Sequence, residues 1–277
     1  CIIPVTRGAQ RSRPADEVVD EVRRLGRGGF SEVVVTGVQI SSYKWSGQGL
    51  VDLTRRLLEE TPVGRLRLSS IAPWQFDHRL LDLFDGPGGD RLCRHFHLSL
   101  QSGCDATLRR MRRPYTAAAF AGLAAEIRRR VPGVALTTDL IVGFPGEDEA
   151  ELEESLAVTR ALRFAKIHAF PYSPREGTAA ATLPGQVDAA VKKRRMAAAL
   201  EAARHAEEAF RRASLGTTTT VLWERRSEGR WQGTSDNYLP VATSATGDLE
   251  RRLTPARLTA LEPGGLVAEI AGSVAVA

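Results

Sequence analysis

The sequence predicts an α/β protein in which a curved parallel sheet carries helices on its outer face and is followed by a small β-barrel. Over residues 1–213, runs of β-branched apolar residues alternate with segments of helical amphipathic periodicity. This alternation is typical of parallel sheets, because a crossover between parallel strands needs a helix-length connection. After residue 215 the helical periodicity gives way to short β runs separated by glycine.

Five strands are expected in the first part, each followed by a helix. The expected strands are 33–36, 66–70, 95–100, 135–142 and 167–170. The expected helices are 14–27, 49–61, 77–85, 104–112, 116–130, 148–162 and 186–213. The first of them begins with Pro14, Asp16 and Glu17, and proline and carboxylates are favoured in a first turn. Right-handed crossovers then produce either a doubly wound sheet or a barrel.

The second part is expected to be a separate domain over residues 214–277, which leaves 1–213 as the first domain. Its β runs are expected at 217–223, 238–243, 249–261 and 266–270. Gly229 and Gly233 are expected to mark turns. A segment of about 60 residues with this pattern suits a small five-stranded barrel of the OB type.

Composition narrows the class of protein. The 277 residues carry a formal net charge of +5 and a pI of about 9.4, which suits a polyanionic partner or a solvated basic surface. No apolar run approaches the roughly 18–20 residues of a membrane-spanning helix. No glycine-rich nucleotide-phosphate loop stands at a strand–helix turn. The three cysteines, Cys1, Cys93 and Cys104, are too few for a disulfide framework, so we expect a cytoplasmic protein without a membrane partner.

Three explanations suit a chain that begins with Cys1. The residue is the lipidated start of an exported lipoprotein, an N-terminal nucleophile, or an internal cysteine exposed by truncation. A lipoprotein cysteine is usually followed by a small polar tether, whereas Ile2, Ile3 and Pro4 are apolar. This difference favours truncation.

Polar and glycine residues gather where the predicted strands end. They are Gly37, Gln39, Gln101, Ser102, Asp139 and Gly143. In barrels the carboxyl-terminal strand ends build the site, so these residues are candidates for holding a cofactor. The alternative is that the polar side chains cap the following helices and the glycines only permit turns. His97 lies in mid-strand and is either a core histidine or a ligand.

These loops together resemble one family, the radical-SAM methylthiotransferases. The resemblance begins with C-I-I-P at Cys1 and R-S-R-P at Arg11, and is most specific in H-L-S-L-Q-S-G from His97. It continues through T-D-L-I-V-G-F-P-G-E from Thr138 to P-Y-S-P-R-E-G-T from Pro171. The resemblance covers nearly the whole chain, and it implies an open barrel of the radical-SAM (β/α)6 type, here incomplete.

The resemblance also implies the chemistry and its cofactors. Three cysteines hold a [4Fe–4S] cluster, Cys1 being the third, and S-adenosylmethionine binds the fourth iron. An electron donor supplies the electron that cleaves the sulfonium to a 5′-deoxyadenosyl radical, which abstracts hydrogen from C2 of an adenine. A second [4Fe–4S] cluster, the source or carrier of sulfur, belongs to an amino-terminal domain outside this chain. That domain, the first barrel strand and two cluster cysteines would precede Cys1, so the chain alone is expected to be inactive.

The resemblance leaves the substrate open between modified adenosines beside the tRNA anticodon. The loop T-G-V-Q from Thr36 and the segment T-S-D-N-Y from Thr234 favour threonylcarbamoyladenosine over isopentenyladenosine. The expected partner is the tRNA anticodon stem-loop, bound by a monomer. The alternatives are a module that only binds tRNA, and a complete metal-free barrel enzyme such as a lyase.

The second part resembles a TRAM domain, whose family role is tRNA binding. Aromatic and arginine side chains are interleaved in it, a composition suited to stacking on unpaired bases and holding a phosphate backbone. The candidate RNA-binding residues are Arg225, Arg226, Arg230, Trp231 and Tyr238. The alternative is a set of core aromatics beside solubilising arginines. A second basic cluster, Arg109 to Arg113, ends a predicted helix near the expected mouth of the barrel.

Overall fold

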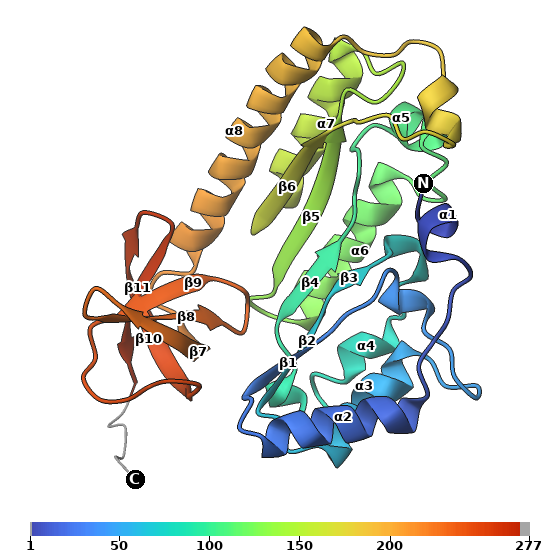
Figure 1. Ribbon diagram of the computed structural model, residues 1–277. Coiled ribbons are helices and arrows are strands. Elements are labelled where there is room, and N and C mark those ends of the chain that lie inside the picture. The colour runs from blue at the N-terminus through green and yellow to red at the C-terminus, as the bar shows by residue number, and fades with distance from the viewer. Residues whose placement is uncertain (1, 272–277) are drawn as a thin grey trace.

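The structure, a computed structural model, describes residues 2–271 and shows a larger α/β part with a smaller barrel at one end (Figure 1). The strands of the larger part are β1 (Glu32–Val35), β2 (Arg65–Leu68), β3 (Ser70–Ile71), β4 (His95–Leu98), β5 (Ala135–Val142) and β6 (Lys166–Pro171). Its α-helices are α1 (Ile3–Arg7), α2 (Ala15–Arg27), α3 (Leu50–Glu60), α4 (Arg79–Asp82), α5 (Asp105–Arg110), α6 (Ala117–Arg130), α7 (Glu149–Leu162) and α8 (Ala189–Ala213).

The strand pairs of the larger part are parallel, as predicted. β1 pairs with β2, while β3, β4, β5 and β6 form a four-stranded sheet in chain order. The predicted strand 66–70 is divided at Ser69, whose N–H donates to Val35 O at 3.0 Å. As a result, the residues before Ser69 form β2 and pair with β1, whereas the residues after it form β3 and pair with β4. The other four predicted strands are confirmed.

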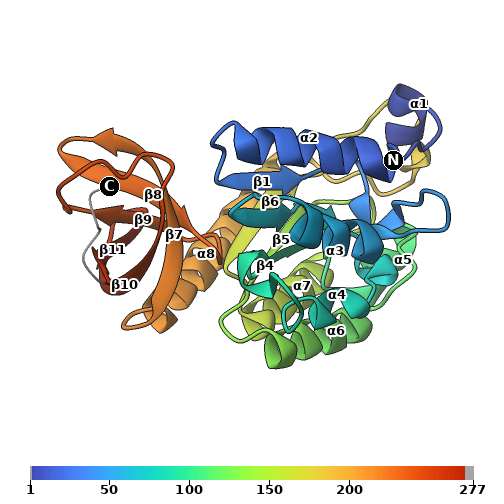
Figure 2. The same ribbon diagram turned by 90° about the horizontal axis from the view of Figure 1, so that it is seen from below.

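The predicted helices are confirmed within a few residues at each end, and α1 is an addition that the sequence pattern did not indicate. Figure 2 shows the helices around the outside of the curved strands. In α6 the buried residues Phe120, Leu123 and Ile127 follow helical spacing and join the core with Phe96 and Leu136 of the sheet. The long helix α8 packs along β6 and β5 and returns the chain to the opposite end of the sheet (Figure 1).

The smaller part is a closed five-stranded barrel, which confirms the prediction of a small β-barrel. Its strands are β7 (Thr218–Ser227), β8 (Arg230–Ser235), β9 (Pro240–Thr243), β10 (Leu253–Glu262) and β11 (Gly265–Ile270), in the order β10-β11-β9-β8-β7. The prediction that Gly233 marks a turn is wrong, because the residue lies within β8. A Cβ on Gly233 would lie 2.2 Å from Leu222 O, so glycine is needed here for the close approach of two strands.

The barrel packs against the amino-terminal ends of the parallel strands. Arg65 donates to Thr220 O and Thr234 O, each at 3.1 Å, and Arg67 donates to Ser235 O at 3.0 Å. Both guanidiniums are buried and also bind the carboxylate of Glu32. Apart from Asp139, which lies within β5, the predicted cofactor residues follow the carboxyl-terminal ends of β1, β4 and β5, so most of the candidate site lies at the end of the sheet opposite the small barrel.

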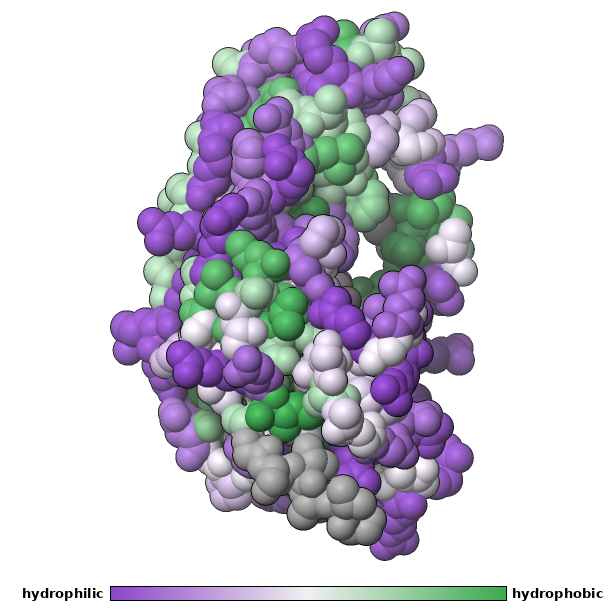
Figure 3. Space-filling model, turned by 90° about the vertical axis from the view of Figure 1, so that its left-hand side faces the viewer, coloured by the Kyte–Doolittle hydropathy of each residue, from purple (hydrophilic) through white to green (hydrophobic). Residues whose placement is uncertain are grey.

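β1 and β6 are the outer strands of the two sheets and do not pair with each other within residues 2–271. Val34 on β1 and Phe170 on β6 are each 49% exposed, which is unusual for apolar residues of a parallel sheet. Figure 3 shows an opening in the molecule to the right of its centre. Across the described chain, no helix combines the length and the apolar character needed to cross a membrane.

Candidate functional site

The loops after β1 and β3 meet at the carboxyl-terminal edge of the sheet. Gln39, which follows β1, donates from Nε2 to Gln75 Oε1 at 2.5 Å. Ser41 Oγ accepts from the backbone N–H of Ala72 at 3.2 Å, which ties the same two loops together. Gly37 is exposed, and a Cβ there would lie 3.3 Å from Ile40. Gln39 and Gly37 are therefore placed where a cofactor at this edge could contact them.

Gln101 holds a strained backbone conformation three residues after the end of β4. Its φ is +65°, in the left-handed region that side chains other than glycine rarely adopt. Its N–H donates to Asp139 O and its carbonyl accepts from Ile141 N, both at 2.9 Å, so β5 holds it in place. Backbone strain of this kind costs about 1–3 kcal/mol and is found most often at functional sites.

Asp139 lies on the inner face of the sheet within a row of polar side chains. Its carboxylate is 3.2 Å from His97 Nε2 and accepts from Ser99 Oγ at 3.3 Å. The row continues through Thr137, whose Oγ1 is 3.0 Å from His97 Nδ1 and 2.9 Å from His95 Nε2. Burial raises the pKa of Asp139, but the hydrogen bond and charge of His97 outweigh it, so the pKa lies below its usual value. Asp139 is thus an anionic acceptor that still reaches solvent.

Ser102 is an internal side chain, contrary to its prediction as a cofactor residue. It is 1% exposed, and its Oγ lies 2.9 Å from Ser155 Oγ and accepts from Cys104 N at 3.1 Å. A hydroxyl with both partners inside the protein has no free contact for a cofactor. The side chain instead joins its own loop to α7 through Ser155.

Gly143, after β5, has a φ of +72° and a crowded neighbourhood. A Cβ there would lie 2.4 Å from Lys192 Cγ on α8. Its N–H donates to Glu147 Oε1 at 2.7 Å, and the same carboxylate pairs with Arg195 at 3.0 Å. Burial outweighs these contacts and raises the pKa of Glu147. The space above Gly143 is therefore filled by Lys192, so this glycine mainly serves the turn.

The described cysteines do not fit an iron–sulfur cluster. Cys1, the residue expected to bind the cluster, lies outside the described residues. Cys93 and Cys104 are both 2% exposed and unpaired, and burial raises the pKa of Cys93 to about 12. Cluster ligands are thiolates, whereas this thiol stays protonated. Within residues 2–271 no group of three metal-binding side chains occurs.

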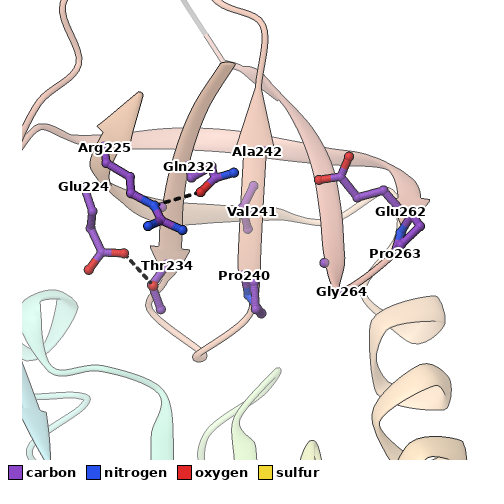
Figure 4. A pocket seen from close by; sticks show the side chains of 12 residues that line it. Glu224, Arg225, Gln232, Thr234, Pro240, Val241, Ala242, Glu262, Pro263 and Gly264 are labelled. Carbon is purple, nitrogen blue, oxygen red and sulfur yellow. Dashed lines mark hydrogen bonds between the residues drawn. The ribbon is translucent and has the colours of Figure 1, made fainter. Parts of the chain in front are cut away.

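The small barrel carries a pocket of about 510 Å³ on its own surface (Figure 4). Arg225 lines it and donates to Gln232 Oε1 at 2.9 Å, while Glu224 accepts from Thr234 at 3.0 Å. Glu262 lies across the pocket and pairs with Arg230 at 2.8 Å. Of the predicted RNA-binding arginines, Arg225 thus lines the pocket, and Arg230 is paired with a residue that lines it.

The other predicted RNA-binding residues are separated by the fold. Arg226 is exposed on the β7–β8 hairpin. Trp231 is 6% exposed in the barrel core and donates from Nε1 to Gly247 O at 3.0 Å, so its prediction as a base-stacking residue is wrong. Tyr238 stacks on His95 with ring centroids 4.5 Å apart and an interplanar angle of 14°. It therefore lies at the junction between the two parts and is 42% exposed, and its role in RNA binding stays a prediction.

Sequence reasoning missed the residues that hold the two parts together and an aromatic pair at the carboxyl-terminal edge. Glu32, Arg65 and Arg67 form the buried ionic cluster of the junction. Arg67, a charged residue inside a predicted core strand, was the signal, because buried charges need partners. Trp74 and Tyr115 stack with ring centroids 5.5 Å apart. Because the two residues are 41 positions apart in sequence, no local pattern indicated their contact.

Residues 1–158 match the Radical SAM superfamily. This segment contains the loops at the carboxyl-terminal edge described above, and the chain belongs to the Radical SAM superfamily. The coproporphyrinogen III oxidase HemN of Escherichia coli has a similar fold, with a TM-score of 0.52 and 12% identity over 88% of this chain and 60% of that one.

The chain is also similar to curated tRNA-modifying enzymes. The tRNA-2-methylthio-N(6)-dimethylallyladenosine synthase of Moorella thermoacetica is 36% identical over 268 residues, which are 93% of this chain and 60% of the relative. The threonylcarbamoyladenosine tRNA methylthiotransferase MtaB of Bacillus subtilis is 34% identical over 269 residues, 93% of this chain and 58% of the relative. The chain spans about three fifths of the length of these relatives.

Proposed function

We propose that the chain is the catalytic core and RNA-binding part of a radical-SAM tRNA methylthiotransferase. The observation that carries the proposal is its similarity, over 93% of its length, to two curated enzymes that modify adenosines in tRNA. The same proposal includes an electron donor as a partner, a monomeric protein and a domain boundary at residue 213. So does the identity of the small barrel as a TRAM domain that binds the anticodon stem-loop.

S-adenosylmethionine is the proposed cofactor at the carboxyl-terminal edge, where it would supply the radical together with a cluster. Asp139, a partly exposed carboxylate of lowered pKa on the inner face of the sheet, would accept hydrogen bonds from ribose hydroxyls. Gln39 and Gln101 would bind the polar methionyl end. The described residues offer no set of thiolates for either cluster. The role of Asp139, Gln39 and Gln101 would therefore be to hold and orient S-adenosylmethionine. The surrounding sheet and helices would limit the contact of the cofactor with water.

The proposed substrate is threonylcarbamoyladenosine in tRNA, with dimethylallyladenosine as the second candidate. The T-G-V-Q loop, which lies at the carboxyl-terminal edge, supports the first candidate. The T-S-D-N-Y segment no longer does, because Ser235, Asp236 and Tyr238 are used in the junction between the two parts. The two curated relatives divide between the two substrates.

The test is nucleoside mass spectrometry of tRNA from cells that lack their own methylthiotransferases. They would carry a chimaera in which the amino-terminal segment of the Bacillus subtilis relative precedes Cys1. We expect 2-methylthio-threonylcarbamoyladenosine, and none from the chain as it stands. A methylthio group on dimethylallyladenosine would overturn the substrate, and a cluster-loaded chimaera without methylthio product would overturn the function. An Asp139→Asn chimaera should keep its cluster absorbance and bind S-adenosylmethionine more weakly.

A further inference from the structure

Trp74 and Tyr115 form a preformed aromatic platform at the carboxyl-terminal edge of the sheet. Their rings are nearly parallel, with an interplanar angle of 9° and centroids 5.5 Å apart. Trp74 follows β3 in the short helix Pro73–Gln75 and is 36% exposed, although it is a large apolar residue. An exposed, rigidly backed indole can take a planar group on the part of its ring that stays exposed, with little loss of side-chain freedom.

The backing of the platform is fixed to the candidate cofactor site. The Tyr115 hydroxyl donates to the carbonyls of Ser99 and Leu100, at 2.9 Å each, and Gln101 follows directly. On the other side, Gln75 is joined to Gln39 by a hydrogen bond of 2.5 Å. The platform therefore stands between the loops after β1 and β4, at the mouth of the sheet rather than on a remote surface.

The charge around the platform suits a phosphate backbone. Arg113 lies with its guanidinium carbon 5.8 Å from the centroid of the Trp74 ring. Neither it nor Arg109 or Arg112 forms an ion pair in the described part of the chain, whereas Arg110 is paired with Glu151. Unpaired guanidiniums beside an exposed indole match the two elements of single-stranded RNA, a charged backbone and flat bases.

We propose that Trp74 stacks on an unpaired purine of the RNA substrate and holds it at the mouth of the sheet, with Arg113 beside the adjoining phosphate. This inference rests on the proposed function and adds a substrate-binding residue to it. Trp74 takes the role that the sequence assigned to Trp231, because its ring is accessible and that of Trp231 is not.

The test measures binding of two stem-loop RNAs to the full chain by fluorescence anisotropy. One RNA has a single adenosine in an otherwise uridine loop, and the other has an abasic site at that position. Trp74→Ala should weaken binding of the adenosine RNA roughly tenfold and leave the abasic RNA unaffected, because stacking requires a base. Trp74→Phe should restore most of the affinity, since a smaller ring still stacks.

Phe30→Ala is the matched control. Phe30 is also an exposed aromatic with an arginine over its ring, Arg251 at 5.6 Å, but it precedes β1 at the opposite end of the sheet. Its removal should change neither affinity. Circular dichroism verifies that each variant is folded, and a Trp74→Ala chain that unfolds is replaced by Trp74→Phe and Trp74→Leu.

Each outcome separates the inference from the proposed function. A wild-type chain that binds neither RNA overturns both. A chain that binds RNA with equal affinity with and without Trp74, or equally with and without the loop adenosine, overturns the stacking inference alone. Loss of S-adenosylmethionine binding with RNA binding intact would assign the platform to the cofactor and also overturn it.

Discussion

At the scale of single residues, burial sets the chemistry of the histidine row inside the sheet. His95 is 6% exposed, and its Nδ1 has no hydrogen-bond partner in the structure. Burial, followed by the charges of Arg67, His97 and His168, lowers the pKa of His95 to about 3. Thr137 is hydrogen-bonded to it and Tyr238 stacks on it, so none of these neighbours supplies the negative charge that would stabilise an imidazolium.

This arrangement predicts acid sensitivity between pH 6.5 and 3. In the unfolded chain His95 takes up a proton near pH 6.5, whereas in the folded chain it does so only near pH 3, so stability is present above this window and is lost as pH falls through it. Between pH 7 and pH 5 the wild type should lose about 2 kcal/mol more than His95→Gln. Urea unfolding at the two pH values measures this. His78→Gln, at an exposed position, is the control, and equal losses in wild type and His95→Gln would contradict the prediction.

At the scale of elements, the turn after β5 and the start of α8 depend on each other. Lys192 on α8 occupies the space beside Gly143 and donates to Tyr172 O at 3.2 Å, with its ammonium 5.6 Å from the Tyr172 ring. The contact connects the ends of β5 and β6 to the helix that leads to the small barrel.

Gly143→Ala should therefore destabilise the protein by more than its backbone strain alone. The left-handed φ of +72° costs alanine about 1–2 kcal/mol, and the new methyl displaces Lys192 from Tyr172. Gly177→Ala is the control, because its φ is +78° and no heavy atom would lie within 4 Å of the new Cβ. Urea unfolding should show the larger loss for Gly143→Ala, and adding Lys192→Ala should reduce the difference. Equal losses at the two glycines would refute the contact.

At the scale of the whole molecule, the small barrel is joined to the sheet by buried charges. Arg94 forms two bonds to the Asp236 carboxylate, at 2.6 and 3.2 Å, while Arg65 and Arg67 bind barrel carbonyls. β5 has 8 residues, and at 3.3 Å per residue its length is about 26 Å. An RNA held by the barrel pocket would have to extend about that far to reach the carboxyl-terminal edge.

Asp236→Ala should loosen this junction. It leaves the half-buried Arg94 without its partner, which is expected to cost roughly 2–3 kcal/mol, less than for a fully buried pair. Because the barrel has its own apolar core, we expect it to separate from the sheet before it unfolds. Small-angle X-ray scattering should record a larger radius of gyration, with Glu250→Ala, an exposed acid of the same barrel, unchanged. The prediction fails if Asp236→Ala keeps the compact radius, or if Arg94→Ala and Asp236→Ala add with no coupling.

The sequence by itself determined most of the succession of strands and helices, the parallel pairing, the small barrel and the superfamily, but it did not indicate α1, β8 or the division of the strand at Ser69. Periodicity and turn residues act over a few positions, so they can be read from the chain locally. Only the tertiary structure decided which polar residues are accessible. It buried Ser102 and Trp231, placed Tyr238 against His95, and brought Trp74 to Tyr115. Accessibility and stacking depend on contacts between segments distant in sequence, which no local pattern encodes.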